Sequence, residues 1–266
     1  MIDTKTLNRF RIAPINTQEI KFNLYAPIEK INHTEKHKNE FIVYKDDKFV
    51  VKLQGKKLTQ VHKDIMDIVM FYGRDFKKND LFGKTITLYE IQKRLQYKSK
   101  NNNKWIREKL KELKRATIEI TKKRKDGKNQ VFEISILRAT LLDEETQEYA
   151  IIFEELYLMF FELYVSINYK TLLKDILNLE HAITKASVRY LLTFKEHQIN
   201  IDKLLDRIGI IGSKRNIEIH RKKLLEELKQ VGHKFGIEII KGRTLKDYVI
   251  RYKKPQEVKF YYPPKE

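Results

Sequence analysis

The apolar residues of this chain change their spacing twice in the same order, and this repeat constrains the fold more than any other feature. In the first stretch, spacings of three and four, as in Val61, Ile65 and Ile68, give way after Ala116 to strict alternation with polar residues. Spacings of three and four mark one face of a helix, and alternation marks a half-buried strand. The order predicted for residues 59–136 is therefore helix, helix, helix, strand, turn, strand.

Local signals mark the boundaries of these elements. Thr59 can cap the first helix, Gly73 can end it, and Thr87-Leu-Tyr-Glu90 has the spacing of a capping box that opens the second. The third helix places four apolar residues on one face: Trp105, Ile106, Leu110 and Leu113. Asp126-Gly127 is a hairpin signal between the two strands. This is the element order of a winged helix-turn-helix.

The same order returns later in the chain. A helix around Tyr190 precedes a short helix over 201–208, and a long helix follows Gly212-Ser213. Two strands are then predicted, over Ile237–Lys241 and Tyr248–Tyr252. A chain of 266 residues is long enough for two domains that each bury a core. We therefore predict an α+β fold of two winged-helix domains, related as a duplication.

The five prolines separate a folded middle from two ends. Pro14 and Pro27 lie near the start, and the other three follow residue 254. We predict an N-terminal arm over 1–40, a first winged-helix domain over 41–165, a second over 166–254 and a C-terminal tail over 255–266. A hairpin of Phe41–Tyr44 and Phe49–Leu53 opens the first domain. Residues 154–176 are too apolar for a free linker, so we expect the two domains to pack together.

The charge balance points to a polyanionic partner. The chain has 55 Lys and Arg against 36 Asp and Glu, a formal net charge of +19, and such an excess favours nucleic acid. An AT-rich genome, which enriches Lys, Ile and Asn whatever the function, is the alternative explanation. The absence of cysteine excludes disulfides, thiolate nucleophiles and cysteine-ligated zinc. The sequence has no membrane span or signal-peptide pattern, so we expect a cytoplasmic protein.

Helical spacing places charged side chains on the outer faces of both third helices. At about 100° per residue, the face of the second domain's helix opposite Ile217 and Leu224 points outward. It carries Arg215, Ile219, Lys222 and Glu226, with Glu218 and Lys223 beside them. The matching face in the first domain carries Lys104, Glu108, Lys111 and Arg115, with Arg107 beside them. In a major groove, Arg or Lys can bond guanine, Glu can accept from cytosine, and Ile can contact a thymine methyl. A solvated helix face is the alternative, although it does not require an outward isoleucine.

Basic residues also gather at the predicted hairpin turns. Lys123, Arg124, Lys125 and Lys128 surround the first turn, and Arg243 lies at the smaller turn of the second domain. A hairpin tip can place cations on phosphates or in the minor groove. We therefore expect the first turn to contact nucleic acid.

The sequence lacks the patterns of enzymes that cut DNA or hydrolyse ATP. Its seven histidines include no His-x-His pair, with which a rolling-circle nickase holds a metal ion, and no glycine-rich phosphate loop is present. Asp143, Glu144 and Glu145 are interpreted as a solvated turn. We expect no enzyme activity, no metal and no cofactor.

Several segments together resemble the iteron-binding replication initiator (Rep) proteins of theta-replicating bacterial plasmids, which are built from two winged-helix domains. The resemblance covers most of residues 41–254 as a pattern of elements, and its individual motifs are degenerate. In the first domain it rests on Leu58-Thr-Gln-Val-His-Lys-Asp64 and on residues 105–120. In the second it rests on Ile183-Thr-Lys-Ala-Ser-Val-Arg-Tyr-Leu-Leu-Thr193, Ile201-Asp-Lys-Leu-Leu-Asp-Arg-Ile-Gly209, Gly212-Ser-Lys-Arg215 and Lys223-Leu-Leu-Glu-Glu-Leu-Lys229.

The resemblance implies a specific function and specific contacts. Such initiators bind direct repeats (iterons) in the double-stranded DNA of a plasmid origin, help to open it, and recruit the host replicative helicase, often with the host initiator. Many exist in a monomer–dimer equilibrium in which the dimer represses its own gene. The implied base readers are Arg215, Glu218, Ile219, Arg221 and Lys222, with Ser213 and Lys214 as further DNA-binding residues. The second contact set is Lys104, Arg107 and Lys111. A two-domain transcriptional repressor and a tyrosine-dependent nickase remain the alternatives.

Overall fold

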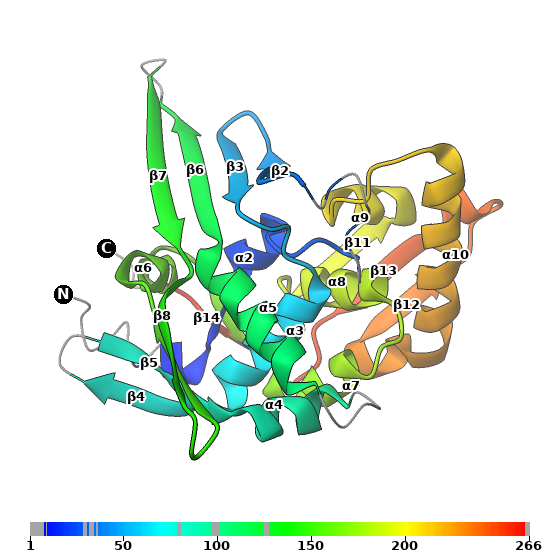
Figure 1. Ribbon diagram of the computed structural model, residues 1–266. Helices are drawn as coiled ribbons and strands as arrows, with labels where there is room; N and C mark the ends of the chain where they lie inside the picture. The colour runs from blue at the N-terminus through cyan, green and yellow to red at the C-terminus, as the bar shows by residue number, and fades with distance from the viewer. Residues whose placement is uncertain are drawn as a thin grey trace.

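The computed structural model has a mixed α+β fold, as the sequence predicted (Figure 1). The structure describes residues 8, 10–28, 31, 35, 37–78, 81–96, 102–124 and 128–263. Within these ranges the strands form two three-stranded and two four-stranded sheets, and no helix is long and apolar enough to cross a membrane. One cluster of buried apolar side chains extends from Phe10 to Val258, so the two predicted units share a core.

The first unit begins with α3 (Gln60–Tyr72), whose first turn is tied to α5 (Asn103–Arg115). The Thr59 backbone N–H donates to Nδ1 of His62 at 3.0 Å, and Nε2 of the same ring donates to Glu112 at 2.8 Å. Burial lowers the pKa of His62. Burial alone would raise the pKa of Glu112, but hydrogen bonds from His62 and Lys109 outweigh it and hold that pKa well below its usual value. A charged carboxylate beside a neutral imidazole therefore joins the two helices.

The second helix, α4 (Leu88–Leu95), starts where the sequence predicted. The Thr87 hydroxyl accepts from the Glu90 N–H at 3.1 Å, which is half of a capping box, while the Glu90 carboxylate pairs with Arg94. In the third helix, α5, three of the four residues predicted on the apolar face, Ile106, Leu110 and Leu113, are buried, and Trp105 is half-buried. The charged face of α5 is consequently turned away from the core.

Four antiparallel strands complete this unit in the order β4 (Arg74–Lys78), β5 (Leu81–Thr87), β9 (Glu148–Phe153) and β8 (Leu137–Asp143). The segment Tyr149–Phe153 lies within β9, between β5 and β8 in this sheet. Gly83 of β5 is required by the close approach of β9, because a Cβ atom at this position would lie 2.2 Å from the carbonyl oxygen of Ile151. The β8–β9 hairpin, and not the one predicted, therefore pairs with the strand that precedes α4.

The predicted hairpin after α5 forms, but in a separate sheet. Its strands, β6 (Thr117–Lys123) and β7 (Asn129–Ser135), continue the N-terminal hairpin β2 (Glu40–Lys45) and β3 (Phe49–Gln54) in the order β2-β3-β6-β7. Val51 and Leu53 of β3 are fully buried and pair with Ile120 and Ile118 of β6. Burial of these four side chains explains why β6 pairs with β3.

The second unit consists of α8 (Ala182–Leu191), β11 (Glu196–Asn200), α9 (Ile201–Arg207), α10 (Lys214–Val231), β12 (Ile237–Ile240) and β13 (Val249–Lys253). Its sheet order is β11-β13-β12. In both units the last strand is the middle one of three: β9 lies between β5 and β8, and β13 lies between β11 and β12. The repeat of element order therefore extends to strand connectivity, with β6–β7 inserted in the first unit.

The predicted arm and tail are built into the fold. Phe10, Ile15 and Tyr25 are buried, although they fall in the predicted N-terminal arm. A three-stranded sheet joins β1 (Ile15–Asn16), β10 (Ser166–Asn168) and β14 (Lys259–Tyr261), and α2 (Thr17–Lys21) follows β1. The segment between β9 and α8, which we call the connector, contributes α6 (Glu155–Leu163), β10, η1 (Lys170–Leu172) and α7 (Leu173–Leu177). β1 and β14, from the predicted arm and tail, therefore both pair with β10 of the segment that links the units.

Candidate nucleic-acid interface

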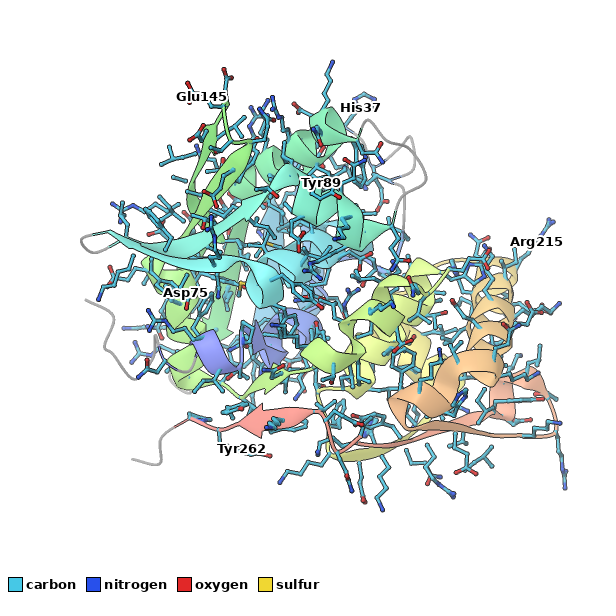
Figure 2. All side chains as sticks on the ribbon, turned by 90° about the horizontal axis from the view of Figure 1, so that it is seen from below. His37, Asp75, Tyr89, Glu145, Arg215 and Tyr262 are labelled. Carbon is cyan, nitrogen blue, oxygen red and sulfur yellow. The ribbon has the colours of Figure 1, made fainter. Side chains whose placement is uncertain are left out.

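The third helix of the second unit, α10, presents the outward face that the spacing predicted. The Ser213 hydroxyl caps its start, accepting from the Asn216 N–H at 3.4 Å. Leu224, Leu225 and Leu228 are buried. The exposed residues from its cap to its third turn include Ser213, Lys214, Arg215, Glu218, Ile219 and Lys222. Figure 2 shows Arg215 extending from the start of α10 into solvent.

The charged side chains on this outward face make only weak interactions within the chain. Lys222 Nζ lies 3.2 Å from Glu218 Oε1, and both side chains are more than half exposed, so this pair stabilises the helix little and can exchange partners. Among the residues that the structure describes, Lys214 and Arg215 have no ion-pair partner. The first two turns of α10 can therefore offer cations, a carboxylate and one apolar side chain to a ligand.

Arg221, which the family resemblance placed among the base readers, is an internal residue instead. Its side chain is 6% exposed, and its Nε and Nη2 atoms donate to Asp202 Oδ1 at 2.8 and 2.6 Å. Arg221 lies four residues after Ile217 and three before Leu224, on the inward stripe of α10. Its guanidinium joins α10 to the first turn of α9, so we remove it from the candidate readers.

The connection between β12 and β13 forms a small basic surface of the second unit. Arg243, Lys241 and Lys246 are exposed there. Backbone and hydroxyl hydrogen bonds from Thr244 lower the pKa of Asp247 and hold the turn in one conformation. Arg243 therefore lies on an ordered turn between β12 and β13, as its position between the two predicted strands indicated.

The outward face of α5 is more self-contained than that of α10. Lys104 and Lys111 are exposed, and Lys111 Nζ lies 2.9 Å from Glu108 Oε1. Arg107 is half-buried, and its Nη2 donates to Gln147 Oε1 in the β8–β9 turn at 2.6 Å. Arg107 is thus partly occupied in positioning this turn.

The basic hairpin tip lies at the outer end of the β2-β3-β6-β7 sheet. Lys123, Arg124 and Lys128 are exposed, and the Arg124 N–H donates to the Lys128 carbonyl at 2.9 Å. Lys125 and the Asp126-Gly127 turn lie outside the described residues. Figure 1 shows β6 and β7 extending away from the helices, far from α10. Any ligand that touches both surfaces must therefore span much of the molecule.

An ion network between the two units was not predicted. We call it the junction network: Glu19, Lys63, Asp64, Asp67, Lys185 and Arg189, three carboxylates and three cations from α2, α3 and α8. Arg189 is 1% exposed. It donates to Asp64 Oδ1 at 2.6 Å and Asp67 Oδ2 at 3.0 Å. The aspartates of α3 thereby bind the cations of α8, which fixes one unit against the other.

Further bonds complete this network. Lys185 Nζ lies 2.6 Å from Asp64 Oδ2, and Lys63 Nζ lies 2.9 Å from Asp67 Oδ1. The Tyr169 hydroxyl donates to Asp67 at 2.8 Å, and burial followed by the charge of Asp67 raises the pKa of that hydroxyl. Removing one partner from such a buried ion pair is costly, because it leaves the other charge buried without compensation.

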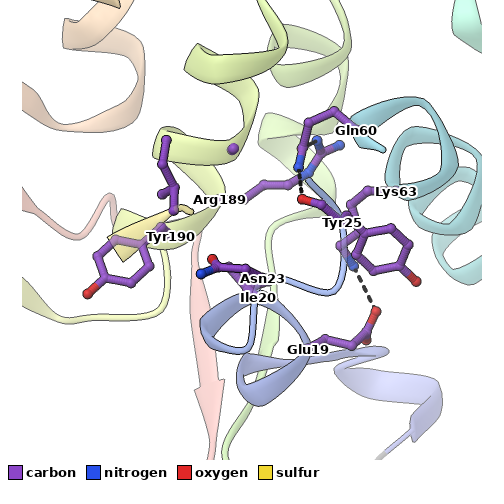
Figure 3. Close-up of a pocket in the computed structure, with 10 residues that line it drawn as sticks. Glu19, Ile20, Asn23, Tyr25, Gln60, Lys63, Arg189 and Tyr190 are labelled. Atoms are coloured by element: carbon purple, nitrogen blue, oxygen red, sulfur yellow. Dashed lines mark hydrogen bonds and ion pairs between the residues drawn. The ribbon is translucent and has the colours of Figure 1, made fainter. Parts of the chain in front are cut away.

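A small pocket lies beside the junction network (Figure 3). Its free volume is about 20 Å³, room for about one water molecule. Gln60 closes one side by donating to the Tyr25 carbonyl at 2.8 Å. The pocket is therefore a packing defect of the junction and too small for an organic ligand.

The sequence matches no protein-family model and no curated protein. By structure, the chain is similar to a crystal structure titled as selenomethionine derivatives of domains 2 and 3 of RctB, with a TM-score of 0.59, 10% identity, and coverage of 90% of this chain and 98% of that one. A second crystal structure of RctB domains 2–3 gives a TM-score of 0.51 at 10% identity, covering 88% and 96% of the two chains. The chain therefore has a fold similar to that of these two RctB domains.

Proposed function

We propose that this chain is a replication initiator that binds double-stranded DNA by sequence. The observation that carries the proposal is the similarity of nearly the whole chain to RctB domains 2 and 3, since RctB is a replication initiator. The initiator-like fold agrees with the family resemblance in the sequence. In this proposal both units act as winged helices, in which the third helix enters the major groove. The matching strand orders β5-β9-β8 and β11-β13-β12 support this interpretation.

In this proposal α10 reads bases. Its first turns are exposed and carry Arg215, Glu218 and Lys222 without a buried partner. Arg and Lys can bond guanine O6 and N7, and Glu can accept from the cytosine amino group. Ser213 and Lys214, at the amino end of the helix, are placed to bond a phosphate, because helix N-termini favour anions.

The first unit contributes phosphate contacts. Lys104, Lys111 and the tip cations Lys123, Arg124 and Lys128 are exposed, and Arg243 adds a similar contact in the second unit. Phosphate contacts position a protein on a duplex without reading its sequence. The net charge of +19 then contributes mainly to affinity and to its dependence on salt.

The biological role in this proposal follows the resemblance. The ligand is a set of direct repeats at a plasmid origin. The chain acts in the cytoplasm without enzyme activity. It helps to open the origin and recruits the host helicase, with the host initiator as a further partner. A monomer–dimer equilibrium would allow the dimer to repress its own gene. A transcriptional repressor would use the same α10 surface, and it is distinguished by its DNA, a lone inverted repeat in a promoter.

The proposal is tested by selecting duplexes from a random pool and then footprinting the protein on DNA that carries the selected motif. We expect one enriched motif, protection over tandem copies, and no strand cleavage when Mg²⁺ is added. Enrichment without any shared motif would contradict sequence-specific binding. A covalent tyrosyl–DNA adduct would show a nickase instead.

A further inference from the structure

Two isoleucines at the start of α10 are exposed to solvent. Ile211 is 91% exposed, the largest fraction of any large apolar side chain in the described ranges, and Ile219 is 43% exposed. Single exposed apolar residues are common on proteins. Here, however, Ile211 lies in the turn that leads into α10 and Ile219 in its second turn, on the helix that carries the candidate base readers.

The backbone holds Ile211 in its outward position. The preceding residue, Ile210, is buried, and its N–H donates to the Leu205 carbonyl at 2.9 Å. Gly209, at a φ of +83°, reverses the chain after α9. Ser213, two residues after Ile211, caps α10. Ile211 is thus anchored on both sides, so its exposure belongs to the built turn between α9 and α10.

Ile219 lies in the middle of the charged face. It is four residues after Arg215 and three before Lys222, so these three side chains are neighbours on the helix surface. A face designed only for solvent or for phosphates gains nothing from an isoleucine. A face that reads bases does, because the C5 methyl of thymine is the apolar group on the major-groove edge.

The first unit provides an internal comparison. The matching outward positions of α5 are all charged: Lys104, Glu108, Lys111 and Arg115. Since only α10 combines charged and apolar side chains outward, the two third helices are suited to different tasks. The first can grip phosphates, and the second can also distinguish bases.

We infer that Ile211 and Ile219 read thymine methyl groups in the major groove, an inference that rests on the proposed DNA-binding function. From Ser213 to Ile219 the helix rises roughly 9 Å. Base pairs are stacked about 3.4 Å apart. The two isoleucines therefore read two thymines that lie a few base pairs apart in the binding site.

The test compares thymine with deoxyuridine, which lacks only the C5 methyl. In the duplex selected by the protein, each thymine is replaced in turn, and the dissociation constant is measured for the wild type, Ile211→Ala, Ile219→Ala and Ile42→Ala. Ile42 is 63% exposed on β2, in the first unit, and serves as the matched control. All three substitutions remove an exposed side chain, and unchanged thermal unfolding confirms that each variant is folded.

We expect deoxyuridine at either of two positions to weaken wild-type binding by about fourfold, the effect of losing one buried methyl group. Ile219→Ala should weaken binding to the thymine duplex similarly and become insensitive to deoxyuridine at one of these positions; Ile211→Ala should do so at the other. Ile42→Ala should behave as the wild type.

Two results separate the inference from the function on which it rests. Sequence-specific binding with no response to deoxyuridine, or with an equal response in the wild type and both α10 variants, overturns the methyl reading and leaves DNA binding intact. Absence of any sequence preference overturns both. The same outcome, joined to loss of a protein partner in Ile211→Ala, would assign this surface to protein docking.

Discussion

Replacement of Arg189 by methionine should destabilise the protein more than any exposed substitution. Arg189 is almost fully buried and donates to Asp64, Asp67 and Gln60 at 2.6 to 3.0 Å. Methionine retains most of the side-chain volume, so the loss is mainly electrostatic. It leaves two buried aspartates with fewer partners.

The expected magnitude follows from what remains around those aspartates. Removing one partner of a buried ion pair costs about 3–5 kcal/mol. Asp64 keeps Lys185 at 2.6 Å, and Asp67 keeps Lys63 at 2.9 Å, so we expect a loss near the lower end, about 3 kcal/mol. Since whole proteins are stable by about 5–15 kcal/mol, this is a large part of the total.

Urea unfolding measures this loss with two probes. The single tryptophan, Trp105, lies in α5 and reports on the first unit, while circular dichroism reports on both. Because the junction network couples the units, the two curves should coincide in the wild type and separate in Arg189→Met. Lys222→Ala, which removes the exposed pair with Glu218, is the control and should cost less than about 1 kcal/mol. A loss below about 1 kcal/mol in Arg189→Met would refute the role assigned to the network.

Three further predictions concern pH, salt and α10. The pKa values of His62 and Glu112 both lie below their ordinary values of 6.5 and 4.5, so the unfolded chain binds more protons than the folded one. The free energy of unfolding should therefore fall as the pH drops below about 6.5 and again below about 4.5. In a pH series of urea titrations, His62→Gln should flatten the fall that begins near pH 6.5. Replacing Lys123, Arg124 and Lys128 at the β6–β7 tip with alanine should lower affinity for all duplexes and reduce the slope of log K against log salt by about one unit per lost contact. An unchanged slope would show that this tip does not contact DNA. Arg221→Ala should lower the thermal stability through its lost pair with Asp202 and leave the base preference intact, whereas a changed preference in a selection experiment would return Arg221 to the readers.

Local signals in the sequence were sufficient for the main helices of the two repeated units, but not for α2, α6 and α7. The starts of α3, α4 and α10 depend on Thr59, Thr87 and Ser213, each of which acts within three residues of itself. The inward stripe of α5 follows equally from its spacing. Such features are encoded in short windows, so periodicity and capping residues identify them.

The pairing of distant segments could not be predicted in the same way. The hairpin β6–β7 alternates as a wing strand would, and only its contact with β3 decides which sheet it joins. Phe10, Ile15 and Tyr25 have no regular spacing, and they are buried against distant segments: Phe10 against Phe82 and Phe153, Tyr25 against Lys63, and Ile15 in a strand pair with Ile167. Sequence pattern identifies an apolar face but not its partner.

Charged residues were the hardest to assign. Asp64 and Asp67 lie three apart in α3, and Lys185 and Arg189 lie four apart in α8, a complementary pattern that could have indicated the junction network. Arg221 was assigned by resemblance, although its spacing from Ile217 and Leu224 already placed it inward. Helical position was therefore a better guide to this side chain than analogy.

The most direct test of base reading by α10 is the ratio of dissociation constants for random and selected duplexes at one salt concentration, measured for the wild type, Arg215→Ala and Lys229→Ala. Lys229 is an exposed cation about 20 Å farther along the same helix. We expect a wild-type ratio of about 10³ or more, a loss of about 1–3 kcal/mol in Arg215→Ala on the selected duplex alone, and little change in Lys229→Ala. A wild-type ratio near one, or an equal loss of Arg215→Ala on both duplexes, would contradict base reading by α10.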